Sequence, residues 1–288
     1  MQNISQNISP SRRKFLRGLT ATGLVGLSLV GAYATLVEPY YYELTNTDIF
    51  IHDLPEGFDN FRIAHITDVH HSRLVPIEEV ARVVEITAAA KPDMVALTGD
   101  YTTSRRGYIE PCAETLSFLT RVVPAGVWAV LGNHDHYTDG ELTVRAFKRR
   151  GINVLENANT NLRRGEDALQ VIGVDDWGWG KSDWGRSLDG VDRARPTVLL
   201  SHEPTVFEMP QTRGLSLILS GHTHGGQISL PFIGPPARHV KEFKYVRGLY
   251  EREGTQLYVS RGTGLTGLPV RFGARPEIAV LRLRRREK

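Results

Sequence analysis

The sequence has one cysteine, Cys112, among 288 residues. A single cysteine cannot form a disulfide within the chain, so a disulfide-stabilised fold is excluded. If the protein is exported, its stability must come from apolar packing or bound metal. We also find no internal repeat, no low-complexity segment and no linker after the N-terminal segment. An apolar content of 41% and a charged content of 23% are those of an ordinary globular protein.

The sequence has little excess charge of either sign. Its formal net charge is +3, and four positive residues with no acidic residue precede Thr35. Removing residues 1–34 would take away these four charges and leave −1. The basicity therefore resides largely in the leader, and we expect no nucleic-acid partner.

Arg12 and Arg13, followed by Lys14-Phe15-Leu16-Arg17, precede an apolar run from Gly18 to Val37. This order resembles a twin-arginine export signal, a route that carries folded proteins, often with metals loaded. Cleavage after Ala34 is one outcome; the alternative is an uncleaved membrane anchor, since about twenty apolar residues can span a bilayer. We therefore expect residues 1–37 to be a signal or anchor recognised by the twin-arginine translocation machinery. The protein would then be periplasmic, extracytoplasmic or membrane-anchored, and residues 38–288 would form the functional domain.

Beyond the leader, short apolar strands alternate with helical spacing, which predicts an α/β fold. The last third is typical of short all-β portions with a hairpin near Glu253-Gly254. Strands are predicted over 40–52, 61–67, 94–98, 127–131, 152–155, 168–174, 197–200, 215–219, 245–261 and 277–283, and helices over 76–90, 109–122 and 139–150.

The apolar run Leu215–Leu219 ends in a glycine-rich segment that contains His222 and His224. In extended backbone, residues two apart point to the same side, so both imidazoles could bind metal, one ion each or one ion together. A pair of surface histidines is the alternative. Four other strands also end in potential metal ligands: Asp68 and His70, Asp100, Asn133 and His134, and His202. Because ligands bind at the carboxyl ends of strands in α/β sheets, we expect these residues to meet.

These blocks, in this order from Arg62 to Gln227, resemble the calcineurin-like metallophosphoesterase superfamily. Residues 260–264 and 269–278 further resemble its exported or membrane-bound bacterial branch, the YkuE/YaeI-like phosphodiesterases. The resemblance implies two mixed β-sheets packed face to face and flanked by helices. It also implies two divalent ions (Mn, Fe or Zn), bound by one set of Asp68, His70 and His224 and another of Asn133, His202 and His222, with Asp100 shared by both.

The hypothesis for catalysis is that water bridging the two ions attacks phosphorus while His134 protonates the leaving oxygen. Protein Ser/Thr phosphatases have an aspartate where this sequence has Thr103, and purple acid phosphatases have a tyrosine there, so both branches are disfavoured. Asp135 is a candidate to orient His134; a structural turn residue is the alternative.

Arg105 and Arg106 could reach a phosphate, and Trp177 and Trp179 could form a substrate wall or a lipid-facing lip. A solvated loop and ordinary aromatic packing are the respective alternatives. The expected function is hydrolysis of a phosphodiester or pyrophosphate, in a lipid-linked or envelope molecule such as a UDP-diacylglucosamine-type glycolipid of lipid A biosynthesis. A general phosphomonoesterase or nucleotidase and a non-catalytic metal-binding scaffold are the alternatives.

Overall fold

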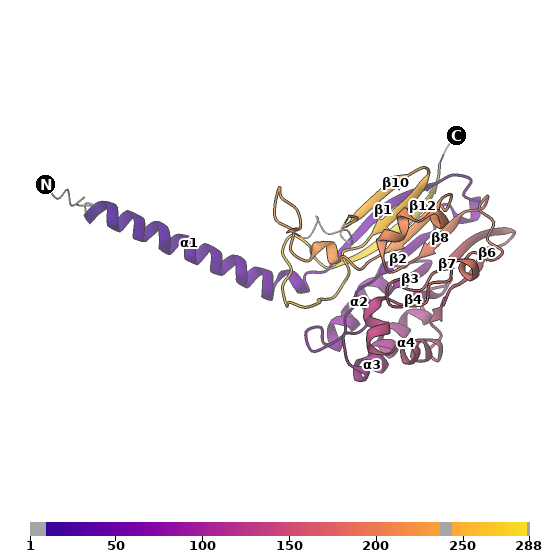
Figure 1. Cartoon of the computed structure of the whole chain (residues 1–288), viewed down its shortest axis with the longest axis horizontal. Helices are drawn as coiled ribbons and strands as arrows, with labels where there is room; N and C mark the ends of the chain where they lie inside the picture. The colour runs from indigo at the N-terminus through magenta and orange to yellow at the C-terminus, as the bar shows by residue number, and fades with distance from the viewer. Residues whose placement is uncertain (1–9, 237–243, 287–288) are drawn as a thin grey trace.

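The computed structural model describes residues 10–236 and 244–286. It contains two six-stranded mixed sheets, with strand orders β1-β12-β2-β3-β4-β5 and β10-β11-β9-β8-β7-β6. Figure 1 shows the sheets stacked, with α2, α3 and α4 lying together beside the first one. The predicted two-sheet sandwich flanked by helices is therefore confirmed.

The first sheet comprises β1 (Glu43–Ile51), β12 (Glu277–Arg285), β2 (Arg62–Ile66), β3 (Met94–Thr98), β4 (Val127–Val130) and β5 (Asn153–Val154). Strands β2 to β5 run parallel, β12 is antiparallel to β2, and β1 pairs in parallel with β12 at the edge. Its outer face is covered by α2 (Ile77–Ala89), α3 (Ile109–Ser117) and α4 (Asn133–Lys148). The parallel strands therefore end at one edge of the sheet.

The second sheet comprises β10 (Gly248–Arg252), β11 (Thr255–Val259), β9 (Leu217–Ser220), β8 (Thr197–Leu200), β7 (Asp167–Gly173) and β6 (Ala158–Arg164). Strands β7, β8, β9 and β11 run parallel, while β10 and β6 are antiparallel edges. The predicted hairpin is the β10–β11 turn. Short helices accompany this sheet: α5 (Trp184–Ser187), η5 (Pro204–Glu208) and η6 (Pro210–Thr212).

Alternation of side chains along the strands divides the apolar core into layers. In β3, Met94 and Ala96 face the second sheet, whereas Val95 and Leu97 pack under the helices. All five residues of β3 are buried, as expected for a parallel strand covered on both faces. The packed layers hold the strand ends, and the loops that follow them, in fixed positions.

Two sequence predictions differ from the structure. Helix α4 begins at Asn133, not at Asp139, which instead marks a kink with non-helical backbone where its carboxylate accepts from Leu142 N at 3.0 Å. Asp139 is thus an N-cap inside a longer helical segment. Strand β6 was not predicted, because the sequence of this edge strand is largely polar.

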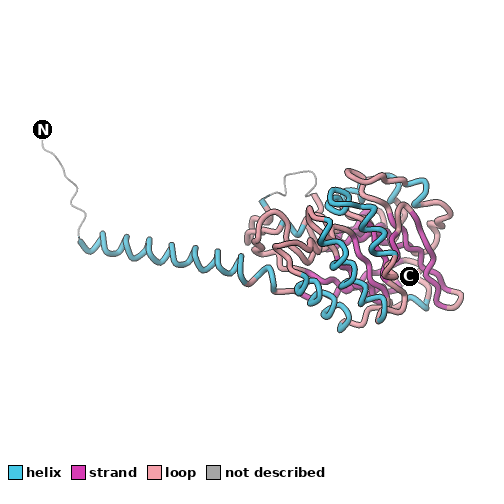
Figure 2. Tube along the Cα trace, turned by 90° about the horizontal axis from the view of Figure 1, so that it is seen from below, coloured by secondary structure: helices cyan, strands magenta, loops and turns pink. Residues whose placement is uncertain are grey.

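Helix α1 (Pro10–Leu36) extends away from the two sheets (Figures 1 and 2). Its carboxyl end is attached to the domain, since Ala34 is buried and its carbonyl accepts from Arg271 N at 3.0 Å. Among the described residues, no helix combines the length and apolar character needed to cross a membrane.

Candidate metal centre

Loops that follow five strands bring the candidate ligands together at one edge of the sandwich. Strands β2, β3 and β4 of the first sheet and strands β8 and β9 of the second lead into these loops. The residues concerned are Asp68, His70, Asp100, Asn133, His202, His222 and His224. The structure joins all seven in one network of contacts, although His224 follows Asp68 by more than 150 positions in the sequence.

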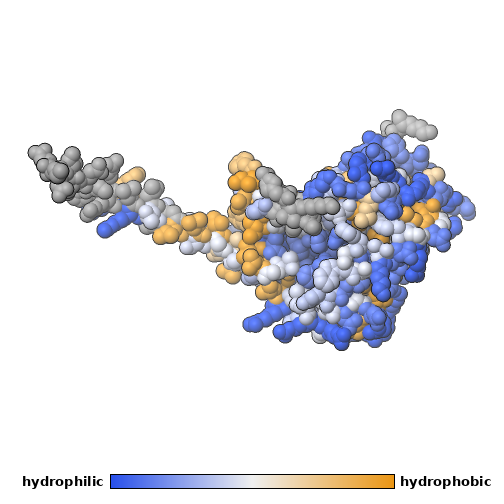
Figure 3. Space-filling view, viewed as in Figure 1, coloured by the Kyte–Doolittle hydropathy of each residue, from blue (hydrophilic) through white to orange (hydrophobic). Residues whose placement is uncertain are grey.

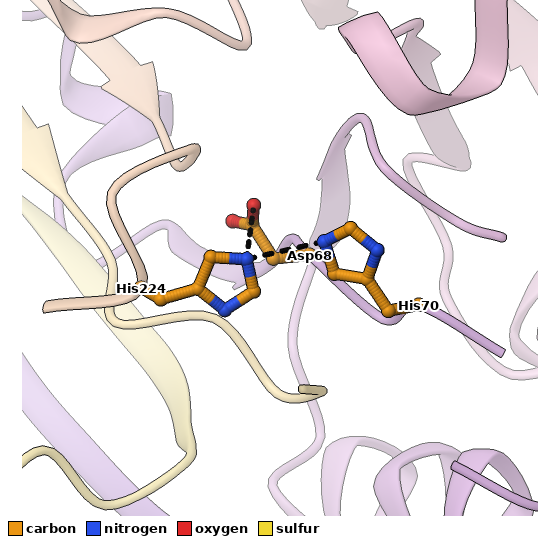
Figure 4. Close-up of side chains that lie close together, drawn as sticks. All are labelled: Asp68, His70 and His224. Carbon is orange, nitrogen blue, oxygen red and sulfur yellow. Dashed lines mark hydrogen bonds and ion pairs between the residues drawn. The ribbon is translucent and has the colours of Figure 1, made fainter. Parts of the chain in front are cut away.

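The first set consists of Asp68, His70 and His224. The two Nε2 atoms of His70 and His224 lie 3.1 Å apart, and His224 Nε2 lies 3.4 Å from Asp68 Oδ1. Figure 4 shows the two imidazoles and the carboxylate close together, Asp68 and His70 from the loop after β2 and His224 from the loop after β9. Three donor atoms that converge in this way can be spanned by one ion.

The second set consists of Asn133, His202 and His222. His202 Nε2 lies 3.1 Å from Asn133 Oδ1 and 3.1 Å from His222 Nδ1. Asp100 lies between the sets, with its Oδ2 3.4 Å from His70 Nε2 and 3.3 Å from His202 Nε2. One carboxylate oxygen is therefore in reach of both groups of donors.

The backbone around the ligands is unusual. Five of the seven residues have positive φ angles between 52° and 69°, namely Asp68, His70, Asp100, His222 and His224. This left-handed conformation is uncommon for residues other than glycine and is concentrated at functional sites. The prediction that His222 and His224 lie on an extended segment is therefore wrong. Strand β9 ends at Ser220, and left-handed turns direct His222 toward the second set and His224 toward the first.

Two hydrogen bonds fix the orientation of ligand imidazoles. His202 Nδ1 donates to the carbonyl of Thr98 at 2.8 Å, which turns Nε2 toward the centre. His70 Nδ1 lies 2.7 Å from Thr103 Oγ1, so its Nε2 also faces the centre. In the sequence analysis Thr103 was only the residue that replaces the aspartate or tyrosine of other branches. In the structure its hydroxyl holds His70 in place.

The electrostatics suit a cation. Burial lowers the pKa of His70 to about 3 and that of His222 to about 4, and it lowers the pKa of His224 well below the ordinary value. These imidazoles are neutral near pH 7 and offer lone pairs. Burial alone would raise the pKa of Asp100, but the neighbouring His202 outweighs it and keeps Asp100 ionised. A buried set of nitrogen and oxygen donors without thiolate fits divalent Mn, Fe or Zn.

His134 lies at the rim of the first set. Its ring meets that of His70 edge to face, with centroids 4.8 Å apart, and its Nδ1 is buried without a hydrogen-bond partner among the described residues. Its backbone N donates to Asp100 Oδ1 at 2.9 Å, which fixes the start of α4 next to the shared carboxylate. The imidazole thus stands beside the centre, and nothing in the described part of the chain restrains its Nδ1.

Of the two tasks considered for Asp135, its contacts match the structural turn residue and not the group that orients His134. Its Oδ2 accepts from the backbone N of Asp100 at 2.7 Å and of Gly132 at 3.0 Å, and its Oδ1 accepts from Tyr101 N at 2.9 Å. Both carboxylate oxygens are thus used to hold the loops after β3 and β4, and neither bonds to the ring of His134. Burial, followed by the nearby Asp100 charge, raises the pKa of Asp135 to about 7.

From the sequence alone Arg271 had no role of its own, because it appeared only within residues 269–278, which resemble the bacterial branch. In the structure Arg271 is fully buried beside the first set. Its guanidinium donates to the carbonyls of Gly264 at 2.6 Å, Ala274 at 2.7 Å and Arg261 at 2.9 Å. Its Nη2 also lies 3.4 Å from His224 Nδ1. Burial lowers its pKa to about 10, which still leaves it cationic near pH 7. Arg271 thus joins His224 to the loop that follows β11.

The candidate substrate residues lie around the rim. Arg105 is exposed, and Arg106 forms an ion pair with Asp139 at 2.9 Å while its side chain remains 74% exposed. Trp177 Nε1 donates to Glu203, the residue after His202, and the Trp179 ring meets Tyr137 edge to face at 5.9 Å.

The loop that carries the two tryptophans is held in place by a bond to α4. Asp175 Oδ1 lies 2.6 Å from His136 Nε2, and the Asp175 Oδ2 accepts from Lys181 N at 3.0 Å. His136 and Tyr137 lie two and three residues after His134 in α4, so the loop with the two tryptophans packs beside the start of this helix. Contact with a substrate stays a prediction for these four rim residues.

Comparison with known proteins agrees with this geometry. Residues 61–226 match the family described as calcineurin-like phosphoesterase. The chain is 33% identical over 279 residues to the uncharacterized metallophosphoesterase YkuE of Bacillus subtilis, covering 95% of this chain and 98% of that one. It is 31% identical over 281 residues to the phosphodiesterase YaeI of Escherichia coli, covering 95% and 99%. Among solved structures, the NAD nucleotidase NadN of Haemophilus influenzae matches with a TM-score of 0.46 and 14% identity, over 71% and 50% of the two chains.

A two-sheet sandwich whose strand ends gather imidazole, carboxylate and amide groups around a shared aspartate defines the class of metal-dependent phosphoesterases. The chain belongs to the calcineurin-like phosphoesterase family. It is a hydrolase of phosphoester bonds, with a centre suited to two divalent ions.

Proposed function

We propose that the protein hydrolyses phosphodiester or pyrophosphate bonds at a centre of two divalent ions. The observation that carries this proposal is Asp100 Oδ2, which lies within 3.4 Å of an imidazole nitrogen from each set. When bound, two such ions lower the pKa of water and neutralise charge on phosphoryl oxygens. Asp68, His70 and His224 would hold one ion, Asn133, His202 and His222 the other, and Asp100 both.

His134 is the proposed general acid. Its imidazole is beside both His70 and Asp100, and it would give a proton to the leaving oxygen as the phosphorus–oxygen bond breaks. General acid catalysis contributes about 10²–10⁴-fold to a rate, so His134→Ala should lose turnover by about that factor while still binding metal. Metal content and kinetics measured on the same preparation test this, with exposed His52→Ala as the matched control. Full turnover in His134→Ala would remove the assignment.

The reaction class is tested with two chromogenic substrates. Hydrolysis of bis-p-nitrophenyl phosphate in the presence of Mn or Zn, lost on chelation, is the expected result. Preference for p-nitrophenyl phosphate would identify a phosphomonoesterase or nucleotidase instead, and hydrolysis of neither would indicate a metal-binding scaffold. The similarity to the phosphodiesterase YaeI of Escherichia coli supports the first outcome.

A lipid-linked phosphate ester or pyrophosphate is the proposed natural substrate class, and a UDP-diacylglucosamine-type glycolipid is one member of it. Support comes from exposed apolar side chains in loops next to the first set, among them Phe232 and Leu268. The test compares kcat/KM for a long-chain substrate in mixed micelles with that for its short-chain analogue. Equal values would reject the lipid-linked class and leave phosphodiesterase activity intact.

Residues 1–37 are proposed to be a twin-arginine leader that directs the folded protein out of the cytoplasm. The order Arg12, Arg13, Phe15 and Leu16 at the start of α1, before the apolar run that begins at Gly18, supports this. Replacing the pair by Arg12→Lys and Arg13→Lys should retain the protein in the cytoplasm with its metal content unchanged. Export of the double variant at the normal rate would contradict this route.

A further inference from the structure

Two loop segments that contain no charged residue lie together beside the metal centre. They are residues 227–236, which follow the His224 turn, and residues 262–270, which follow β11. Phe232 is fully exposed, Leu268 is 60% exposed and Leu230 is 38% exposed. Single exposed apolar side chains are common on protein surfaces, but a continuous uncharged apolar patch marks a binding surface. We call these two segments the apolar loop pair.

The apolar loop pair is cross-linked by hydrogen bonds. Ser229 N donates to the carbonyl of Phe272 at 2.6 Å, and Phe272 N donates to the carbonyl of Gln227 at 3.0 Å. The Gln227 side chain donates to the carbonyls of Thr266 at 3.0 Å and Leu268 at 3.2 Å. The two loops therefore form one unit, and their apolar side chains are held outward by its backbone.

The base of the apolar loop pair is part of the wall of the metal centre. Thr263 N donates to the carbonyl of Thr67 at 3.0 Å, and Gly264 N donates to that of Asp68 at 2.7 Å. A Cβ at Gly264 would come within 2.0 Å of the Val69 carbonyl oxygen, which shows how closely the second loop lies on the ligand loop. A surface bound by the loop pair is thus brought next to the centre.

The same side of the molecule carries the apolar helix α1. Its carboxyl end is joined to the second loop by the Arg271–Ala34 backbone bond. Exposed apolar residues along the helix include Leu24, Val25, Leu27, Leu29 and Val30. Figure 3 shows apolar surface along α1, next to a second apolar column on the domain where the helix ends.

Arginines stand at the base of the apolar loop pair. Arg247 is exposed and donates to the carbonyl of Gly273 at 2.7 Å, and the Arg275 guanidinium lies 4.5 Å from the centroid of Tyr41. An uncharged tip with cationic residues behind it matches the order of a phospholipid surface, in which acyl chains lie below anionic headgroups.

We infer that the apolar loop pair docks on a bilayer that contains anionic phospholipid, so that Phe232 and Leu268 enter the acyl boundary and the metal centre faces the headgroups. The α1 helix adds apolar surface on the same side, and docking does not require it to cross the bilayer. The docking itself is independent of phosphoester chemistry; only its meaning for substrate access rests on the proposed function.

Vesicle flotation of the full-length chain tests the docking. The vesicles are phosphatidylcholine with phosphatidylglycerol, and the variant is Phe232→Ser with Leu268→Ser. We expect its partition coefficient to fall about tenfold or more, since two side chains that leave an apolar phase together lose at least that factor. The matched control is Phe118→Ser with Val122→Ser, a pair of exposed apolar residues that follows α3, and it should partition like the wild type.

A site-resolved measurement separates the loops from α1. The only cysteine, Cys112, is buried, so a spin label can be placed at position 232 or 118 through Phe232→Cys or Phe118→Cys. With vesicles, the label at 232 should become accessible to oxygen and protected from a water-soluble paramagnetic reagent, while the label at 118 stays in water.

Three results would overturn the inference. The first is that the loop variant partitions onto vesicles as the wild type does. The second is that the label at position 232 stays exposed to water when vesicles are present. The third is that, without vesicles, this label becomes more immobilised as the protein concentration rises. The last result would show a second copy of the chain on the surface. Turnover of a soluble phosphodiester by the Phe232→Ser and Leu268→Ser variant should be unchanged, so failure of docking and failure of the proposed function are distinguishable.

Discussion

The two ligand sets of the metal centre are built differently. All three residues of the first set have left-handed backbone conformations. Two of them are held by side chains distant in sequence: His70 contacts Thr103, and His224 contacts Arg271. In the second set only His222 is left-handed. Asn133 starts α4, and the carbonyl of Thr98 holds His202.

The ligands of the second set are therefore positioned mostly by regular elements and main-chain hydrogen bonds. Those of the first set depend on particular supporting side chains. A backbone carbonyl is present whatever residue occupies its position, but a hydroxyl or guanidinium is lost by a single substitution. We therefore expect substitutions of supporting residues to empty the first set before the second.

The largest effect should follow a substitution that affects both ligand sets at once. Asp100→Asn removes the charge shared by both sets, and we expect turnover to fall by about a thousandfold or more, since stabilisation of transition-state charge is lost with the ions. Metal analysis should show both ions depleted together. Loss of only one ion would show that Asp100 belongs to one set.

Arg271→Lys should affect the first set next. Lysine cannot bond all the carbonyls that the guanidinium holds, and an unsatisfied buried acceptor costs about 1–3 kcal/mol. We expect a clearly lower melting temperature and about a hundredfold weaker binding of one ion, with the other retained. Calorimetry and metal titration measure both quantities.

Arg282→Lys is the control for this substitution, because Arg282 forms an exposed ion pair with Asp48 at 2.7 Å, and such pairs contribute little. Equal weakening of both ions in Arg271→Lys would contradict the asymmetry between the sets.

Thr103→Val should give a smaller effect of the same kind. It removes the hydroxyl that holds His70 Nδ1, and loss of such a partner weakens metal binding by about tenfold. Thr102→Val is a matched control, because the neighbouring Thr102 is buried and its hydroxyl has no hydrogen-bond partner among the described residues. Titration with Mn should weaken for Thr103→Val alone; a similar loss in Thr102→Val would indicate general disruption of the loop.

The parts of the fold that sequence predicts well are those set by local pattern. Strands β3 and β8 are uninterrupted apolar runs, and their bounds match the predicted ones. Strand β6 has mostly polar residues because it is a solvated edge, so its sequence does not distinguish it from a loop. The start of α4 was misplaced because Asp139 has the chemistry of an N-cap, and nothing in the local sequence shows that a turn of helix precedes the kink.

The candidate site divides in the same way. Its seven ligand-type residues each follow an apolar strand, so their proximity could be expected from the topology of a parallel sheet. The tasks of Thr103 and Arg271 arise from contacts between segments distant in sequence, over 33 positions for His70 and Thr103 and 47 for His224 and Arg271. The left-handed turns that separate His222 from His224 are likewise a tertiary feature, because alternation alone predicts that the two side chains share a face.

Anomalous diffraction from crystals grown with Mn tests the central claim most directly. The account predicts two ions per chain about 3.5–4 Å apart, one beside His70 and His224, the other beside His202 and His222, with Asp100 between them. A single ion, or two ions that do not share Asp100, would contradict it.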